Sequence, residues 1–412
     1  MKIGTFAKKY GLSVYTVRYY ISLGILCPQK INKQYIFDGT CIEDMNLINE
    51  LRKCLFPLKD IKHVLSIKRI SQLKDKTSTD HLISIYENNR SELQKKRNRI
   101  DSAISLLARK INMLHDSDLK QEGLFIQNGM DLGFISFLVC PKCGNTLSFK
   151  DMIIENNAAY HGHISCSCGY FANIKDGIIL TSSMDKNAQV WYTFDNIIKT
   201  ISTDYMNLLF QSYEWMYNKL SEESLNNKTF FCLGESGAEF IYEHINKLGP
   251  DNHYIIYDVA LETIQFAKKR LDSLGSDYKI LYLVGYAENL PLKKSCIDFF
   301  IDDCSSFFDL FDGGSFLIEK IKHLLKREAI ISGLFLSYDK NAPTLINIRK
   351  YWPNALTKFM NFNIFKNSLK ENLFTIIDSK QQGTSSVPGY WPNFQDANDK
   401  LTFNTYYAKS KR

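Results

Sequence analysis

The N-terminal segment from Ile3 to Leu65 constrains the fold most, because it contains two short helical patterns, a turn and a hairpin pattern in one run. Apolar residues recur at helical spacing as far as Tyr10, Gly11 ends that helix, and Ser13 can cap a second one. This order predicts a helix-turn-helix. A small helical core with Tyr and Arg on its surface, without a DNA-binding role, would give a similar sequence pattern. The second helix carries side chains suited to reach base edges and phosphates in a major groove: Tyr15, Thr16, Arg18 and Tyr19.

Basic charge is concentrated in the same region. Residues 1–115 contain 21 Lys and Arg against 10 Asp and Glu, a net charge of +11, whereas the whole chain carries +7, so the remainder carries −4. Basic charge gathered on one part of a chain is typical of phosphate binding. A solvated basic face would give the same counts.

The segment IGTFAKKYGLSVYTVRYYISLGIL, followed by KQYIFD and LFPLKDIKHVL, resembles the MerR family of bacterial transcription regulators. The resemblance implies a winged helix-turn-helix over residues 1–75 that binds promoter double-stranded DNA as a homodimer and acts on RNA polymerase indirectly. By the resemblance, Tyr15, Arg18 and Tyr19 face the DNA. Residues 33–37 would form the wing, in which Lys33 and Tyr35 would contact DNA. Tyr35 stands where the family usually has a wing arginine.

A polar stretch without Pro or Gly predicts one long helix over residues 76–118. The apolar residues of this helix form one narrow stripe, which suits a two-stranded coiled coil. Such a coiled coil would hold two DNA-binding heads at a fixed separation. MerR-like proteins are dimers through an antiparallel pair of such helices. The stripe could instead pack on the next domain of its own chain. Its members fall at heptad spacing, with two residues in the alternate seam position: Tyr86, Leu93, Ile100, Ile104, Leu107, Ile111 and Leu114.

The chain of 412 residues, 45% of them apolar, is expected to form several soluble domains. It contains no apolar run long enough for a membrane span and no signal-peptide pattern, so we expect a cytoplasmic protein without membrane contact. Ten cysteines would be unusual as disulfides in that compartment.

Four cysteines form two short turns, each followed by a glycine, and predict a zinc ribbon over residues 134–182. Four thiolates complete a tetrahedron, so a structural role is expected, with metal sensing as the alternative. The second turn is C-x-C rather than C-x2-C, which leaves His161 or His163 as conceivable ligands. The predicted ligands are Cys140, Cys143, Cys166 and Cys168.

The remainder, residues 186–412, alternates strand and helix patterns and predicts a Rossmann-like α/β fold with a ligand crevice at the carboxyl ends of its strands. The fold class is therefore multidomain, α and α/β. Seven segments should form the sheet: KTFFCL, HYIIYD, KILYLV, CIDFFIDD, EAIISGLFLS, LFTIIDSKQQG and LTFNTYYAKS.

From the ribbon onward the sequence resembles class I methyltransferases that use S-adenosylmethionine. The resemblance implies that Gly234 and Gly237 form the glycine loop, that Asp258 binds the ribose hydroxyls, and that Ala287 and Glu288 follow the third strand. The chain departs from the family pattern at Cys232 and Tyr286, where acids are usual, and at Glu235, whose charge would repel the cofactor carboxylate.

Two functions follow from these observations. The first is a regulator whose methyltransferase-like half has become a sensor for a small-molecule effector, and we favour it. The second is an active S-adenosylmethionine-dependent methyltransferase tethered to DNA. Trp191 and Trp215 lie in an aromatic segment ahead of the first strand that would suit a planar or lipophilic effector, or that could be ordinary core packing.

Overall fold

The computed structural model describes residues 1–72, 74–122, 128–182, 201–275, 278–311, 313–386, 395–396 and 398–411. Contacts divide the chain into two compact units, Met1–Gln121 and Glu122–Arg412, and each unit has a hydrophobic core of its own. Within the described ranges, no helix combines the length and the hydropathy needed to cross a membrane.

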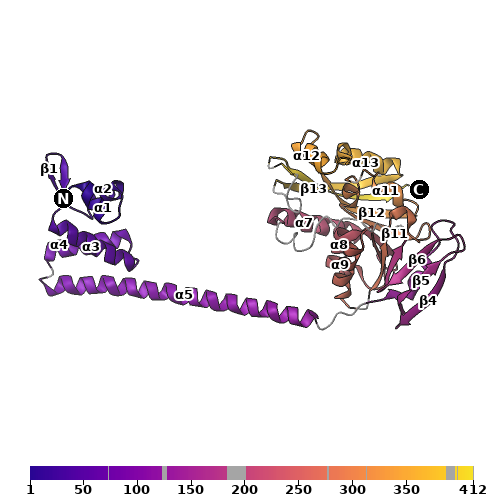
Figure 1. The fold of residues 1–412 in the computed structure, drawn as a ribbon, viewed down its shortest axis with the longest axis horizontal. Helices are drawn as coiled ribbons and strands as arrows, with labels where there is room; N and C mark the ends of the chain where they lie inside the picture. The colour runs from indigo at the N-terminus through magenta and orange to yellow at the C-terminus, as the bar shows by residue number, and fades with distance from the viewer. Residues whose placement is uncertain are drawn as a thin grey trace. The chain divides into compact units, whose positions relative to one another are not determined.

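The first unit begins with the predicted helix-turn-helix, formed by α1 (Ile3–Lys9) and α2 (Val14–Ser22) (Figure 1). Gly11 adopts φ +63°, which allows the tight turn, and the Ser13 side chain accepts a hydrogen bond from the Thr16 amide at 3.0 Å. Helices α3 (Gly39–Lys53) and α4 (Leu58–Ser71) complete a small core.

The wing is a two-stranded antiparallel hairpin, β1 (Gln29–Ile31) and β2 (Gln34–Ile36). Asn32 and Lys33 both have positive φ, at 47° and 63°, as a two-residue type I′ turn requires. The hairpin starts earlier than the predicted wing of 33–37, because its first strand, which carries no distinctive sequence pattern, lies before the turn. Phe37 stacks on Phe6 with ring centroids 4.1 Å apart, which fixes the wing to α1.

Helix α5 (Lys76–Glu122) is 47 residues long, so the predicted long helix is present and extends slightly further than expected. Its first turns pack on the head, where Leu82 is buried and Ile85 is partly buried. Beyond them the heptad positions are open to solvent: Ile100 and Leu107 are each 59% exposed and Leu114 is 68% exposed. The apolar seam therefore lies uncovered along the outer part of the helix.

The second unit contains the seven predicted strands in a Rossmann-like methyltransferase fold. The parallel part runs β10 (Lys279–Val284), β9 (His253–Asp258), β8 (Thr229–Leu233), β11 (Ile297–Asp303) and β12 (Leu325–Ser337). This is the doubly wound order 3-2-1-4-5, whose direction of winding reverses between β8 and β11. Strands β13 (Phe374–Ser385) and β14 (Leu401–Ser410) form a hairpin whose second strand pairs antiparallel with β12.

Helices cover both faces of this sheet (Figure 1). The alternation of side chains along β14 identifies the two faces, since Phe403 contacts Tyr205 and Tyr406 contacts Phe365. These partners lie on α7 (Thr203–Leu220) and α13 (Phe362–Glu371), which therefore cover opposite faces. Helices α8 (Gly234–Leu248) and α9 (Leu261–Asp272) follow β8 and β9, and three shorter helices complete the unit: α10 (Ser305–Phe308), α11 (Leu317–Ile321) and α12 (Pro343–Tyr351).

The cysteine-containing segment extends the same sheet. Its strands are β3 (Met130–Asp131), β4 (Ser148–Glu155), β5 (Ala158–Ser165), β6 (Phe171–Lys175) and β7 (Ile178–Thr181). Strand β7 pairs parallel with β10, which joins the ribbon and the α/β strands into one sheet of twelve. Ile178 and Ile179 point to opposite faces and are both buried, as expected of an interior strand rather than a ribbon edge.

Candidate functional site

Helix α2 presents a face that is open to solvent and suited to DNA. Val17 and Tyr20 anchor the helix in the core, whereas Tyr15 is 81% exposed, Tyr19 is 45% exposed and Arg18 is also exposed. The Thr16 hydroxyl lies 2.8 Å from the Ser13 hydroxyl, so this side chain belongs to the helix cap as well as to the predicted DNA face. Three of the four residues proposed on this helix thus share one free face.

The wing places Lys33 in the exposed turn and leaves Tyr35 partly buried. Lys30, on the facing strand, holds its ammonium group 5.7 Å from the centre of the Tyr35 ring. Sequence reasoning missed Lys30, although it gives the wing a cation opposite the tyrosine that replaces the usual arginine.

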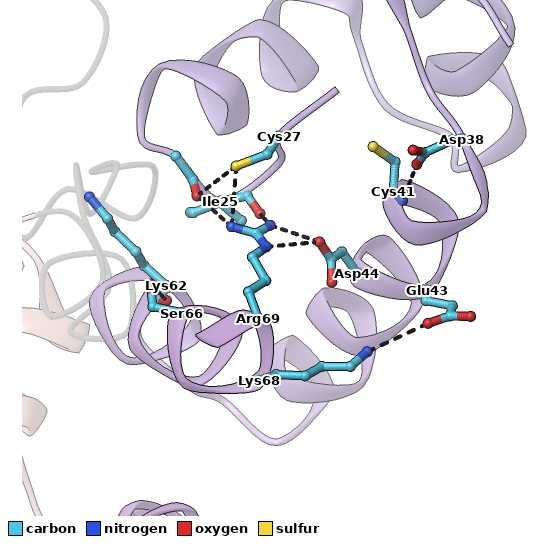
Figure 2. Close-up of polar contacts among 11 residues, drawn as sticks. Ile25, Cys27, Asp38, Cys41, Glu43, Asp44, Lys62, Ser66, Lys68 and Arg69 are labelled. Carbon is cyan, nitrogen blue, oxygen red and sulfur yellow. Dashed lines mark hydrogen bonds and ion pairs between the residues drawn. The ribbon is translucent and has the colours of Figure 1, made fainter. Parts of the chain in front are cut away.

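Arg69 on α4 fixes the chain just after α2, and no sequence pattern pointed to it (Figure 2). Its guanidinium group donates to the Gly24 carbonyl at 3.0 Å and to the Ile25 carbonyl at 2.5 Å. It also forms an ion pair of 2.7 Å with Asp44 of α3, which is buried. One side chain therefore connects α3, α4 and the segment that follows the recognition helix.

The four predicted cysteines meet at one point, with all four sulfur atoms within 4.8 Å of one another. The closest pairs are Cys140 with Cys168 at 3.3 Å and Cys143 with Cys166 at 3.5 Å. Tetrahedral zinc with Zn–S bonds of about 2.3 Å needs sulfur separations of about 3.8 Å, so the thiols fit the ion. The cluster contains neither of the histidines considered as substitutes.

The two cysteine turns owe their shape to the glycines that follow them. Gly144 has φ +75° and donates to the Cys140 carbonyl at 2.8 Å, and Gly169 has φ +85° and donates to the Cys166 carbonyl at 3.0 Å. These turns bring the four thiols toward one point. Four thiolates leave no open coordination position, so the ion would be structural.

Replacing Cys140 and Cys143 with Ser should remove close to one zinc per chain and lower the thermal stability of the second unit, because the ribbon strands belong to its sheet. The first unit has a separate core and should stay folded. Metal analysis and circular dichroism would measure both effects, with Cys296→Ser as a control outside the cluster. Stoichiometric zinc in the double variant would contradict the assignment.

The glycine turn after β8 and the acid at the end of β9 lie together. Gly234 has φ +56°, and a Cβ there would collide with the Asp258 carboxylate. The Ala260 amide donates to Asp258 Oδ1 at 2.8 Å, and the Gly285 amide donates to the Asp258 carbonyl at 2.9 Å. Burial raises the pKa of the Asp258 carboxyl to about 6, against the effect of the backbone amides.

The second motif glycine is required by packing. A Cβ at Gly237 would lie 2.6 Å from the Cβ of Cys232, so α8 packs directly on the end of β8. Cys232, where the family usually has an acid, is buried beneath this contact, and burial raises the pKa of its thiol. Both glycines therefore have a structural reason to be present, whether or not a cofactor binds.

Two consecutive carboxyl groups, Asp302 and Asp303, are completely buried at the end of β11. The Tyr406 hydroxyl of β14 donates to Asp302, which also accepts from the Ser306 amide at 2.8 Å. Tyr406 reaches across β12 because the residue between them in the sheet is Gly333, where a Cβ would lie 2.6 Å from the ring. On the opposite face, the Tyr213 hydroxyl of α7 donates to Asp303 at 2.5 Å.

The chain turns sharply after these carboxyl groups. Cys304 adopts φ +58°, which is unfavourable for a residue with a side chain. The hydroxyls of Ser305 and Ser306 are buried, and in the described part of the structure neither has a hydrogen-bond partner. Strain and unsatisfied buried hydroxyls gather at the reversal between β8 and β11, where doubly wound folds bind ligands.

The remaining predicted positions lie in different surroundings. Ala287 is buried, and Tyr286 beside it is 44% exposed. Trp215 lies on α7 and packs partly buried against the core. Trp191 and the side chain of Glu235 lie outside the described residues.

Asp303→Asn should change how the stability of the second unit depends on pH. Burial, reinforced by the nearby Asp302 and Glu239 charges, raises the Asp303 pKa to about 8, whereas an unfolded Asp titrates near about 3.9. The native state then holds a proton that the unfolded chain lacks, so stability falls as pH rises from about 4 to about 8. The variant should flatten that decline.

Urea unfolding of the native chain and of Asp303→Asn at a series of pH values would measure how the free energy of unfolding depends on pH in each. Asp251→Asn, at an exposed loop position, serves as the matched control and should leave the pH dependence unchanged. An identical decline in the Asp303 variant and the native chain would show that Asp303 is charged when folded.

Comparisons with known proteins divide along the same units. Residues 1–68 match the family described as MerR HTH family regulatory protein. No curated protein matches the chain in a sequence comparison. Solved structures similar to part of the chain include an S-adenosylmethionine-dependent methyltransferase from Aquifex aeolicus, at 14% identity and TM-score 0.34, covering 53% of this chain and 98% of that one.

Two further similar structures are also methyltransferases. A putative sarcosine dimethylglycine methyltransferase from Galdieria sulphuraria has 12% identity and TM-score 0.36, with 48% of this chain and 85% of that chain covered. A geranyl diphosphate C-methyltransferase from Streptomyces coelicolor has 10% identity and TM-score 0.37, with 51% and 83% covered. The fold assignment rests on the strand order and pairing described above, not on these likenesses.

Proposed function

We propose that this chain, whose residues 1–68 are a MerR-family helix-turn-helix domain, is a transcription regulator that binds promoter DNA as a homodimer. The observation that carries the proposal is the free face of α2, where Tyr15, Arg18 and Tyr19 are exposed on a helix fixed by its buried side. The excess of basic residues over residues 1–115 supplies the electrostatic attraction to phosphates. Lys30 and Lys33 extend the same contact onto the wing.

The dimer would form along α5. Its heptad positions stay exposed over several turns in the single chain, and a second copy of the helix would cover them. Two heads joined in this way would read two half-sites of a promoter. The proposal places the dimerisation helix at 76–118, after a DNA-binding domain of 1–75.

Arg18→Ala should weaken binding to the protein's own promoter by about 1–3 kcal/mol, since an arginine in the major groove binds a base edge or clamps a phosphate. A gel-shift titration at fixed salt measures the change. Arg327→Ala replaces an exposed arginine of the second unit and should bind DNA normally. Unchanged affinity in the Arg18 variant would exclude this residue from the interface.

We propose that the second unit is an effector sensor derived from a methyltransferase fold. The crevice at the reversal of the sheet would hold a small molecule, with Gly234, Glu235, Gly237, Asp258 and Ala287 around it. Three features argue against ordinary cofactor binding. The Asp258 carboxylate lies against the glycine turn, and Cys232 replaces an acid. The Asp303 carboxyl group already accepts a hydrogen bond from the Tyr213 hydroxyl. The buried hydroxyls of Ser305 and Ser306 would gain partners from a polar ligand.

The effector would act by preferring one of two arrangements of the dimer. A change in the angle between the two heads bends and untwists the promoter, and the deformed DNA alters what RNA polymerase can use. Zinc in the four-cysteine cluster would stabilise the ribbon strands beside the crevice unit without taking part in this change.

The alternative is an active methyltransferase tethered to DNA, which the strand order also supports. On the sensor proposal, S-adenosylmethionine should bind poorly, because two polar contacts worth roughly 0.5–1.5 kcal/mol each are lost at Cys232 and Tyr286 and Glu235 adds repulsion. Calorimetric titration of the purified chain tests this. Glu235→Gly should improve the affinity, and Glu235→Gln separates the effect of charge from that of size.

Micromolar binding of S-adenosylmethionine by the native chain, together with methyl transfer to a nucleic-acid or small-molecule acceptor, would replace the sensor proposal with the enzyme. Weak binding without transfer supports the sensor. Both outcomes leave the DNA-binding proposal to be decided by the Arg18 experiment.

A further inference from the structure

We propose that His63 on α4 and His81 on α5 form a binding site for a divalent transition-metal ion, separate from the four-cysteine cluster. The Nε2 atoms of the two imidazoles lie 3.1 Å apart. Their rings are nearly perpendicular, at 87°, with centroids separated by 5.3 Å. The inference goes beyond the proposed function and does not depend on DNA binding.

A hydrogen bond joins the two imidazoles in this arrangement. Neutral imidazole has one protonated and one unprotonated ring nitrogen, so a hydrogen bond between two Nε2 atoms requires one of them to donate and the other to accept. For a divalent cation to bind both Nε2 atoms, the donor imidazole would change tautomer so that its proton lies on Nδ1, and each Nε2 would then offer a lone pair to the ion. The two rings would turn slightly so that both nitrogens point at the ion rather than at one another.

The distance between the nitrogens indicates which ions fit. With metal–nitrogen bonds of about 2.1 Å, a separation of 3.1 Å gives an angle of about 95° at the metal. That angle is close to the right angle between neighbouring ligands of a square-planar or octahedral ion and is smaller than a tetrahedral angle. Ni²⁺ and Cu²⁺ accept nitrogen and oxygen ligands at such angles, so these ions suit the pair.

The protein backbone holds the pair in place from both sides. Val64 and Leu65, which follow His63, are buried in the head, and Leu82, which follows His81, is also buried. The histidines themselves are exposed, so an ion and its remaining water ligands have access from solvent. Both residues stand on helices, which position ligands more reproducibly than loops do.

The site would supply two protein ligands and water for the rest. Among the described residues, the only group of three or more potential ligands within reach of one ion is the four-cysteine cluster. A two-histidine site therefore binds more weakly than that cluster and with a different preference, since imidazole and water favour other ions than four thiolates do.

An ion at this position would join two helices with different tasks. Helix α4 carries Arg69, which holds the segment after the recognition helix, and α5 carries the exposed heptad seam. Metal binding would restrain the start of α5 against α4 within the first unit. The ion would thus stiffen the connection between the head and the long helix.

The test is calorimetric titration of the full chain with Ni²⁺, after its cysteine cluster has been filled with one equivalent of zinc and excess zinc removed. The native chain should bind one Ni²⁺, and His63→Gln and His81→Gln should each weaken that binding by at least about tenfold. His115→Gln removes an exposed histidine further along α5 and should bind Ni²⁺ like the native chain. Glutamine suits a helix, so the variants should keep the native circular dichroism spectrum.

A second readout distinguishes the pair from incidental binding. Ni²⁺ should slow amide hydrogen exchange at the start of α5 in the native chain and in His115→Gln, but in neither variant of the pair. Equal Ni²⁺ affinity in all four proteins, or heat of binding without any protection of α5, would overturn the proposal. Absence of Ni²⁺ binding by the native chain would overturn it as well.

Discussion

A carboxyl group in a dry protein interior needs hydrogen-bond donors, and the second unit buries two consecutive carboxyl groups at the centre of its sheet. Asp302 and Asp303 point to opposite faces because they are neighbours on one strand. Each receives a tyrosine hydroxyl, one from β14 and one from α7. The last strand and the covering helix are therefore held to the end of β11 by polar contacts as well as by apolar packing.

This arrangement also explains the composition around it. Gly333 gives the Tyr406 ring room to cross β12, and a larger residue there would separate the tyrosine from Asp302. Tyr213 packs edge-on against Phe240 of α8 while it donates to Asp303, so the polar contact and the apolar core fix the same side chain.

Local patterns predicted the elements of the structure well. Capping at Ser13, the heptads of the long helix, the paired cysteines and the seven strand segments are each encoded within a few neighbouring residues. The contacts that organise these elements are not encoded locally: Tyr406 and Asp302 are 104 residues apart, and Arg69 is 45 residues from Gly24. Nothing in the sequence around Tyr213, Tyr406 or Arg69 marks them among the other tyrosines and arginines.

The geometry around the predicted glycine turn depends on contacts that the sequence does not reveal. Gly234 and Asp258 each stand at the end of a parallel strand, and the two lie together in the structure. That the Asp258 carboxylate would lie against the glycine turn depends on side-chain rotamers, which spacing does not reveal. The pairing of β7 with β10 was also missed, because a short apolar strand near a zinc ribbon has no feature that identifies its partner.

The pairing of β7 with β10 bears on how this chain can be divided. Residues 280–284 of β10 are buried, and β7 pairs with the backbone of the last three of them along one edge of the strand. A shortened chain that began after the ribbon would leave that edge bare, and a bare apolar edge is a template for pairing with other chains. The ribbon thus covers the edge strand of the α/β half. Separating the two should produce insoluble protein rather than an isolated domain.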